Sequence, residues 1–98
     1  MAFARYVEFE PSDDRGTPNY DAIQDEVGAK DNPPAGLIVH SAGFSDDGIF
    51  RIHEVWETAE QADKFFNEHV MPAVQGLGGE ARDPRVQTGY ELHNVIRG

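Results

Sequence analysis

Alternating apolar and polar side chains mark the strands of this chain. Residues 4–9 place successive side chains on opposite sides, which is typical of a β-strand. Residues 37–44 and 49–56 are further strand-like runs, and the Ser-Asp-Asp-Gly sequence at 45–48 between them predicts a tight turn. We therefore expect these two strands to pair as a hairpin. A last strand is predicted near residues 86–95.

Two helices are predicted between the strands. The first begins at Thr17, an N-cap residue that a proline follows, and stops at Gly28. The second begins at Thr58, with Gln61 at the capping-box spacing, and its apolar residues recur at helical intervals. Pro72 lacks a backbone N–H, so we expect it to kink or break this helix just before its own position.

The order of elements is β-α-β-β-α-β, so the predicted fold class is α+β, a ferredoxin-like four-stranded antiparallel sheet in one domain over residues 1–98. Two helices cover only one face of such a sheet. Burying a large apolar side chain gains roughly 1.5–3 kcal/mol. We expect five hairpin side chains to gather on the uncovered face, namely Ile38, Ala42, Phe44, Ile49 and Val55. A second copy of the chain is the simplest cover, so the pattern predicts a homodimer.

The chain is strongly acidic, with 18 Asp and Glu residues against 8 Lys and Arg residues and a formal net charge of −10. Such a surface repels phosphate backbones and anionic lipids, so neither nucleic acid nor a membrane is an expected partner. The sequence shows no signal-peptide pattern or membrane-spanning run, and it has no cysteine for disulfide or thiolate chemistry. We therefore expect a cytoplasmic protein.

The segment from Gly36 to Val74 resembles part of a known family. Residues 54–58 (Glu-Val-Trp-Glu-Thr), followed by a helix with Phe65 and Phe66, resemble the third-strand-to-helix segment of the dimeric α/β-barrel superfamily. Its best-known members are the antibiotic-biosynthesis-monooxygenase-like proteins. The resemblance implies two ferredoxin-like subunits packed sheet to sheet. It also implies a pocket in each subunit between the sheet and the helices.

By that resemblance, one face of the third strand looks into the pocket. The pocket candidates are Glu54, Trp56, Ser41, Phe66 and His69. A carboxylate among aromatic rings can have a raised pKa and act as a base. The structural alternatives are that Glu54 reaches water at a strand end, that Trp56 is a core anchor, and that His69 points into solvent.

The hairpin also carries two histidines, His40 and His53. A turn centred on residues 46–47 places them directly opposite each other, and a turn centred on 47–48 makes them diagonal neighbours. Both registers put the two imidazoles on one face, which we assign to the dimer contact. A metal needs a third ligand, and His93 is predicted three strand spacings from the second strand, about 14 Å away. We therefore predict cross-strand packing and no metal site.

The sequence has an apolar pocket wall with few polar groups, and it has no GxSxG, HExxH, P-loop or dinucleotide-binding motif. We predict a small-ligand-binding protein of unassigned activity, suited to an aromatic or apolar metabolite and needing no cofactor. The alternative is a cofactor-independent monooxygenase or polyketide-cyclase-like enzyme. The polyketide oxygenases have Asn and Tyr where this chain has Ile52 and Ala62, so the resemblance names no reaction.

Overall fold

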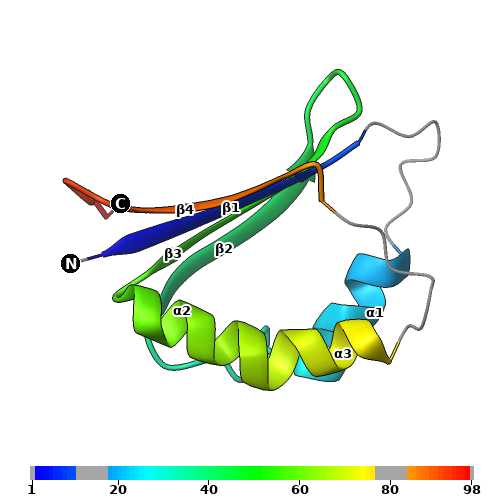
Figure 1. Ribbon diagram of the computed structural model, residues 1–98, viewed down its shortest axis with the longest axis horizontal. Helices are drawn as coiled ribbons and strands as arrows, with labels where there is room; N and C mark the ends of the chain where they lie inside the picture. Colours follow the sequence, from blue (N-terminus) through cyan, green and yellow to red (C-terminus); the bar gives the residue numbers. More distant parts are fainter. Residues whose placement is uncertain (1, 11–17, 77–83, 98) are drawn as a thin grey trace.

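The computed structural model describes residues 2–10, 18–76 and 84–97 (Figure 1). Its helices and strands follow the predicted order, with the second helix divided by a π-helical segment. The elements are β1 (Phe3–Phe9), α1 (Pro18–Val27), β2 (Leu37–Phe44), β3 (Phe50–Trp56), α2 (Ala59–Phe65), the π-helical segment η1 (Phe66–Val70), α3 (Met71–Gln75) and β4 (Val86–Glu91). The four strands form one antiparallel sheet in the order β2-β3-β1-β4. The predicted α+β ferredoxin-like fold is confirmed.

All the helices lie on one face of the sheet, which we call the inner face (Figure 1). Trp56 on β3 packs its ring 5.5 Å from that of Phe65 on α2 and is only 1% exposed, so it anchors the core between the two layers. None of the described helices lies over the opposite, outer face of the sheet (Figure 1).

Capping and turn chemistry set the helix ends as the sequence predicts. The Thr58 hydroxyl accepts the Gln61 backbone N–H at 3.2 Å, which satisfies one of the free donors at the start of α2. Gly28 follows α1 with a φ of +69°, a conformation that L-residues with side chains rarely adopt. The predicted N-cap Thr17 lies outside the described residues.

Pro72 leaves the chain helical, although it changes the hydrogen-bonding pattern. The Met71 N–H bonds to the Phe66 carbonyl, five residues back, and α-helical pairing resumes in α3. The missing donor of Pro72 is therefore accommodated by a widened turn rather than by a break. The last strand also ends earlier than predicted, at Glu91, and the Leu92 N–H just beyond it bonds to the Ala2 carbonyl.

The hairpin register differs from both predicted registers by one residue. His40 pairs with Glu54, and Ser41 pairs with His53. Because side chains alternate along a strand, this puts His40 on the inner face and His53 on the outer face. The prediction that the two histidines share a face, and that His40 belongs to a dimer face, is wrong.

The same register moves two of the five apolar side chains expected on the outer face. Ala42 and Phe44 pair with Ile52 and Phe50 on the inner face, and the Phe44 and Phe50 rings lie 4.9 Å apart. A register shift between Leu37 and Val39 changes the phase again at the start of β2. The outer face of the hairpin keeps Val55 and Ile38, and it carries Val39 and polar side chains beside them.

Candidate functional site

A polar network lies on the inner face between α1 and the sheet. The Tyr20 hydroxyl on α1 is 2.6 Å from His40 Nε2 on β2, and His40 Nδ1 is 2.7 Å from a carboxylate oxygen of Glu54 on β3. The second Glu54 oxygen accepts the Trp56 indole N–H at 3.2 Å. We call these four residues the inner network.

Local structure explains why these side chains meet. His40 and Glu54 face each other across the β2–β3 pair. Tyr20 belongs to the apolar stripe of α1, and its ring lies nearly parallel to the His40 imidazole, with the centroids 6.0 Å apart. The Tyr20 ring also packs edge-on against Phe50 at 5.3 Å. Packing of α1 on the sheet therefore carries the hydroxyl to the histidine.

The inner network is accessible from solvent. The His40 and Glu54 side chains are 23% and 19% exposed, whereas Trp56 is almost completely buried. Trp56 thus holds the Glu54 carboxylate from the core side and offers almost no open surface. The histidine and the carboxylate are therefore partly accessible to solvent, whereas the indole is not.

The electrostatics of Glu54 differ from the prediction of a raised pKa. Burial raises the pKa of this carboxyl, but the hydrogen bonds from His40 and Trp56, together with the nearby charges of His40 and Arg5, outweigh burial and bring the pKa below its ordinary value. Glu54 therefore stays ionised at neutral pH. It can orient the imidazole and balance its charge, but it is a weaker base than we predicted.

Tyr20 and His40 share a hydrogen bond at one end of the inner network. When His40 is neutral and donates its Nδ1 proton to Glu54, its Nε2 lone pair accepts the Tyr20 hydroxyl. Burial, with smaller contributions from the negative charges of Glu54 and Asp21, raises the pKa of Tyr20. Tyr20 thus remains a hydrogen-bond donor at neutral pH, with His40 Nε2 as its acceptor and Glu54 holding the other ring nitrogen.

The remaining pocket candidates lie in two places. His69 packs its ring 5.4 Å from Phe65, and the Phe66 ring lies under the Arg5 guanidinium at 4.7 Å. Both belong to the helical layer that covers the inner face. Ser41, by contrast, pairs with His53 and lies on the outer face, where its hydroxyl bonds to the His53 carbonyl at 3.3 Å. The register places Ser41 on the opposite face from the inner network.

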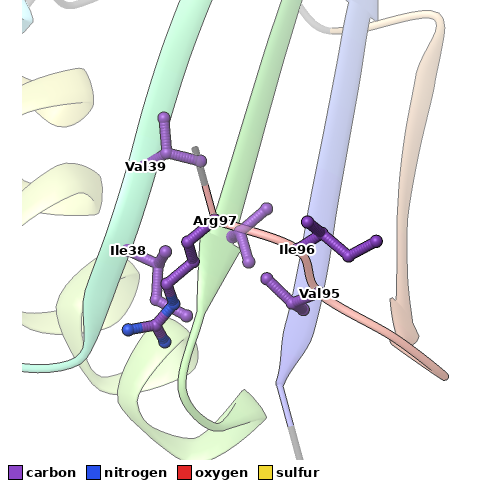
Figure 2. A pocket seen from close by; sticks show the side chains of 6 residues that line it. Ile38, Val39, Val95, Ile96 and Arg97 are labelled. Carbon is purple, nitrogen blue, oxygen red and sulfur yellow. The ribbon is translucent and has the colours of Figure 1, made fainter.

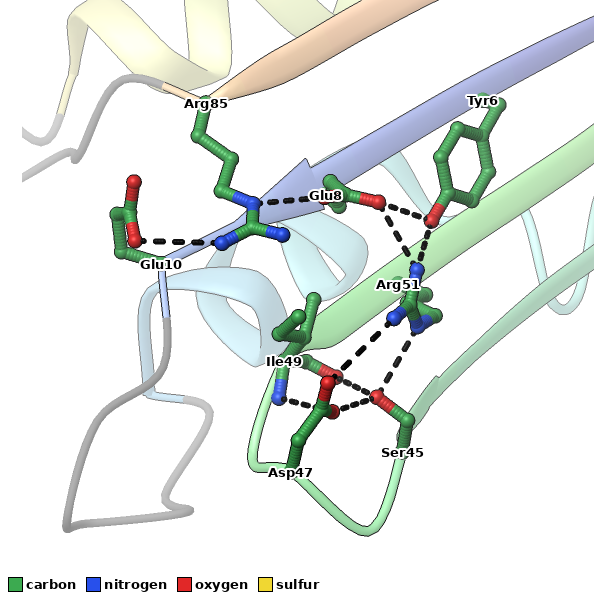
Figure 3. A network of polar contacts seen from close by, with 8 residues as sticks. All are labelled: Tyr6, Glu8, Glu10, Ser45, Asp47, Ile49, Arg51 and Arg85. Carbon is green, nitrogen blue, oxygen red and sulfur yellow. Dashed lines mark hydrogen bonds and ion pairs between the residues drawn. The ribbon is translucent and has the colours of Figure 1, made fainter.

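A second polar network occupies the outer face (Figure 3). The Glu8 carboxylate accepts hydrogen bonds from the Tyr6 hydroxyl, from Arg51 at 2.9 Å and from Arg85 at 2.6 Å. Glu8 is only 7% exposed. We call these four residues the outer network. It ties the β1–β3 pair to the segment that enters β4, so it holds the sheet together.

At the other end of the outer face, the residues after β4 lie across the sheet (Figure 2). They close a cavity of about 380 Å³ that is apolar apart from one arginine. Its lining residues are Ile38, Val39, Val55, Val95, Ile96 and Arg97. Ile96 is 87% exposed, which leaves a large aliphatic side chain at the surface.

Within the described ranges, no three His, Cys, Asp or Glu side chains converge to hold a metal ion. None of the helices in these ranges has the length and apolarity needed to cross a membrane. The inner network is therefore the part of the described structure with the clearest capacity for chemistry.

Comparison with solved structures identifies the fold. Rv0793 from Mycobacterium tuberculosis superposes with a TM-score of 0.71 at 17% identity, covering 99% of this chain and 100% of that one. An antibiotic biosynthesis monooxygenase candidate from Deinococcus radiodurans gives 0.69 at 17% identity, covering 99% and 97%. The hydroxynitrile lyase from Passiflora edulis gives 0.64 at 10% identity, covering 98% and 97%. No protein-family model matches the sequence, and no curated protein sequence matches it either.

The chain therefore shares the α+β ferredoxin-like fold of these structures, several of which are named as antibiotic biosynthesis monooxygenase candidates. The predicted resemblance is confirmed at the level of the fold. The similar structures carry names of different activities, and a shared fold does not select among them.

Sequence reasoning missed two residues of the inner face. Tyr20 was not among the pocket candidates, although a hydroxyl at a packed helix position needs a partner. Arg5 occupies the same side of β1 as Val7 and Phe9, and a charged residue on an apolar strand face is a detectable signal.

Proposed function

We propose that this protein binds a small, partly aromatic molecule on the inner face, with Tyr20 and His40 as the polar contacts. The observation that supports this proposal is the solvent-accessible Tyr20–His40–Glu54 connection beside a packed aromatic layer. Sites for small organic ligands combine an apolar wall with a few oriented polar groups. The inner network has this composition, and Glu54 and Trp56 fix the orientation of its histidine.

The first experiment removes one hydroxyl from each face. A set of aryl ketones and aryl amides is titrated by isothermal calorimetry into wild type, Tyr20→Phe and Tyr90→Phe. Tyr90 lies on the outer side of β4, so its variant is a matched control. We expect Tyr20→Phe to weaken binding about tenfold through loss of a buried hydrogen bond, with the control unchanged. Equal affinity in all three proteins would contradict the assignment of the inner face.

A second candidate function is catalysis by proton transfer without a cofactor, and the position of His40 between a hydroxyl and a carboxylate favours it. In this reaction His40 Nε2 takes a proton from an acidic C–H bond of the ligand, and Glu54 stabilises the imidazolium. The Tyr20 hydroxyl turns to donate to the oxyanion that forms, and the proton then returns to the product. An intramolecular cyclisation needs only this transfer and return of one proton, so its atoms and charges balance. A monooxygenase reaction requires O₂ as a further reactant.

The predicted homodimer also remains our proposal. Val39, Val86 and Tyr90 are exposed on the outer side of the sheet, and Ile96 is exposed in the residues that follow β4. Their burial against a second copy is favourable, and a two-fold axis presents the same patch from both subunits. Light scattering is expected to give about 22 kDa, twice the chain mass of 10.9 kDa. Val39→Asp should shift the mass to that of one chain, and a wild-type monomer at micromolar concentration would refute the proposal.

A further inference from the structure

Arg5 lies beside the inner network on the same face of the sheet. Its position on β1 pairs with Glu54 on β3, which in turn pairs with His40 on β2. These three residues therefore form a row across three neighbouring strands. Strands are about 4.8 Å apart, so the Arg5 and His40 ends of the row are separated by about 10 Å.

The Arg5 guanidinium is held in place by an aromatic ring, and its hydrogen-bond donors have no acceptor in the described ranges. It lies over the Phe66 ring, 4.7 Å from the centroid. It makes no hydrogen bond or ion pair with any residue in the described ranges. Arg51 and Arg85, on the outer face, both donate to Glu8. Within the described ranges, Arg5 thus differs from these two arginines in having no hydrogen-bond acceptor for its planar set of donors.

Glu54, its cross-strand neighbour, does not need these donors. One Glu54 oxygen accepts the His40 Nδ1–H and the other accepts the Trp56 indole N–H. The negative charge of Glu54 keeps the guanidinium close by electrostatic attraction without a direct contact. An unpaired guanidinium stacked on an aromatic ring is suited to a planar oxyanion, which accepts two parallel hydrogen bonds.

We propose that the ligand of the inner face carries a carboxylate or an equivalent planar oxyanion, which Arg5 binds. The aromatic part of the ligand then extends along the row toward Tyr20 and His40, and its length matches one or two fused rings. This inference rests on the proposed function and narrows it to aromatic organic acids. It also explains how a chain of net charge −10 binds an anion, because Arg5 supplies a local positive charge.

The test compares acids with their neutral isosteres. Benzoate with benzamide, 2-naphthoate with 2-naphthamide, and indole-3-acetate with indole-3-acetamide are titrated calorimetrically into wild type, Arg5→Gln, Arg5→Lys and Arg97→Gln. Arg97→Gln removes the same charge from the opposite face and is the matched control. Circular dichroism and thermal melting of each variant verify that it is folded.

We expect wild type to bind at least one acid about tenfold or more tightly than its amide. Arg5→Gln should abolish this preference and leave amide affinity unchanged, Arg5→Lys should keep part of it, and Arg97→Gln should keep all of it. Equal wild-type affinity for acids and amides, or a preference that survives in Arg5→Gln, would overturn the inference and leave the proposed binding function intact. Failure of every acid and every amide to bind wild type would overturn both.

Discussion

The two faces of the sheet carry polar networks that are similar in size and different in chemistry. In the outer network one carboxylate, Glu8, is surrounded by a hydroxyl and two guanidinium groups. In the inner network one imidazole, His40, lies between a hydroxyl and a carboxylate. Guanidinium groups keep their protons at all ordinary pH values, whereas an imidazole gains and loses a proton near neutrality.

This difference separates a structural network from a functional one. The outer donors converge on a carboxylate that is 7% exposed, so the Glu8 oxygens are occupied by hydrogen bonds within the network. The inner network is reachable through His40 and has the Arg5 guanidinium beside it. The number of polar residues in the two networks is the same, so the number alone does not show which face binds a ligand. The two faces differ in their side chains, because the inner face has an imidazole and a guanidinium beside it, whereas the outer face has guanidinium groups paired with a carboxylate.

The largest expected effect concerns proton transfer. If the second candidate function holds, the wild type should accelerate exchange of the α-C–H of propiophenone with D₂O, followed by proton NMR. Loss of a positioned general base lowers a rate by about a hundredfold or more, so His40→Gln should lose most of the acceleration. His53→Gln, on the outer face, should retain it. Similar rates in the two variants would show that the inner network is no more reactive than the outer one.

A smaller effect concerns acid stability, because the pKa of both network carboxyls lies below its ordinary value. For Glu8 the hydrogen bonds from Tyr6 and Arg85 are the main causes, whereas for Glu54 burial opposes the stronger effect of its hydrogen bonds. A lowered pKa gives stability that is present above the unfolded value, near 4.5, and is lost as the pH falls through the folded value. Both carboxylates should therefore contribute to acid unfolding.

Urea unfolding of wild type, Glu8→Gln and Glu54→Gln at pH 7 and pH 3 measures this difference. At pH 7 we expect Glu54→Gln to lower the free energy of unfolding by about 1 kcal/mol, since a glutamine oxygen still accepts the His40 proton. Glu8→Gln should lower it further, because Arg51 and Arg85 lose their counterion. Both differences should shrink at pH 3. A larger loss in Glu54→Gln than in Glu8→Gln would reverse the assignment of structural and functional networks.

Much of the fold could be predicted because its signals are local. The alternation along β1, the Thr58 cap of α2 and the stop at Gly28 each depend on residues within a few positions of one another. Alternation along β3 also put Glu54 and Trp56 on one face, and the family resemblance implied that this face looks toward the helices. Neither conclusion required knowledge of a neighbouring strand.

The candidate site was only partly predictable, because it depends on how strands and helices meet. The turn residues between β2 and β3 allow several registers, and a change of one residue exchanges the faces of His40 and Ser41. This single step separated His40 from His53 and brought it to Glu54. The meeting of Tyr20 with His40 depends in addition on where α1 packs on the sheet.

The order of the elements and their approximate ends could be predicted from the sequence, since they follow from local propensities. The acidic character of the chain follows from its composition. Tertiary structure decided the hairpin register, the buried pairing of Glu8 with two arginines and the row from His40 to Arg5. The physical reason is that hydrogen bonds between distant segments form only after the sheet and the helical layer have packed. Their partners are therefore selected by packing and not by spacing along the chain.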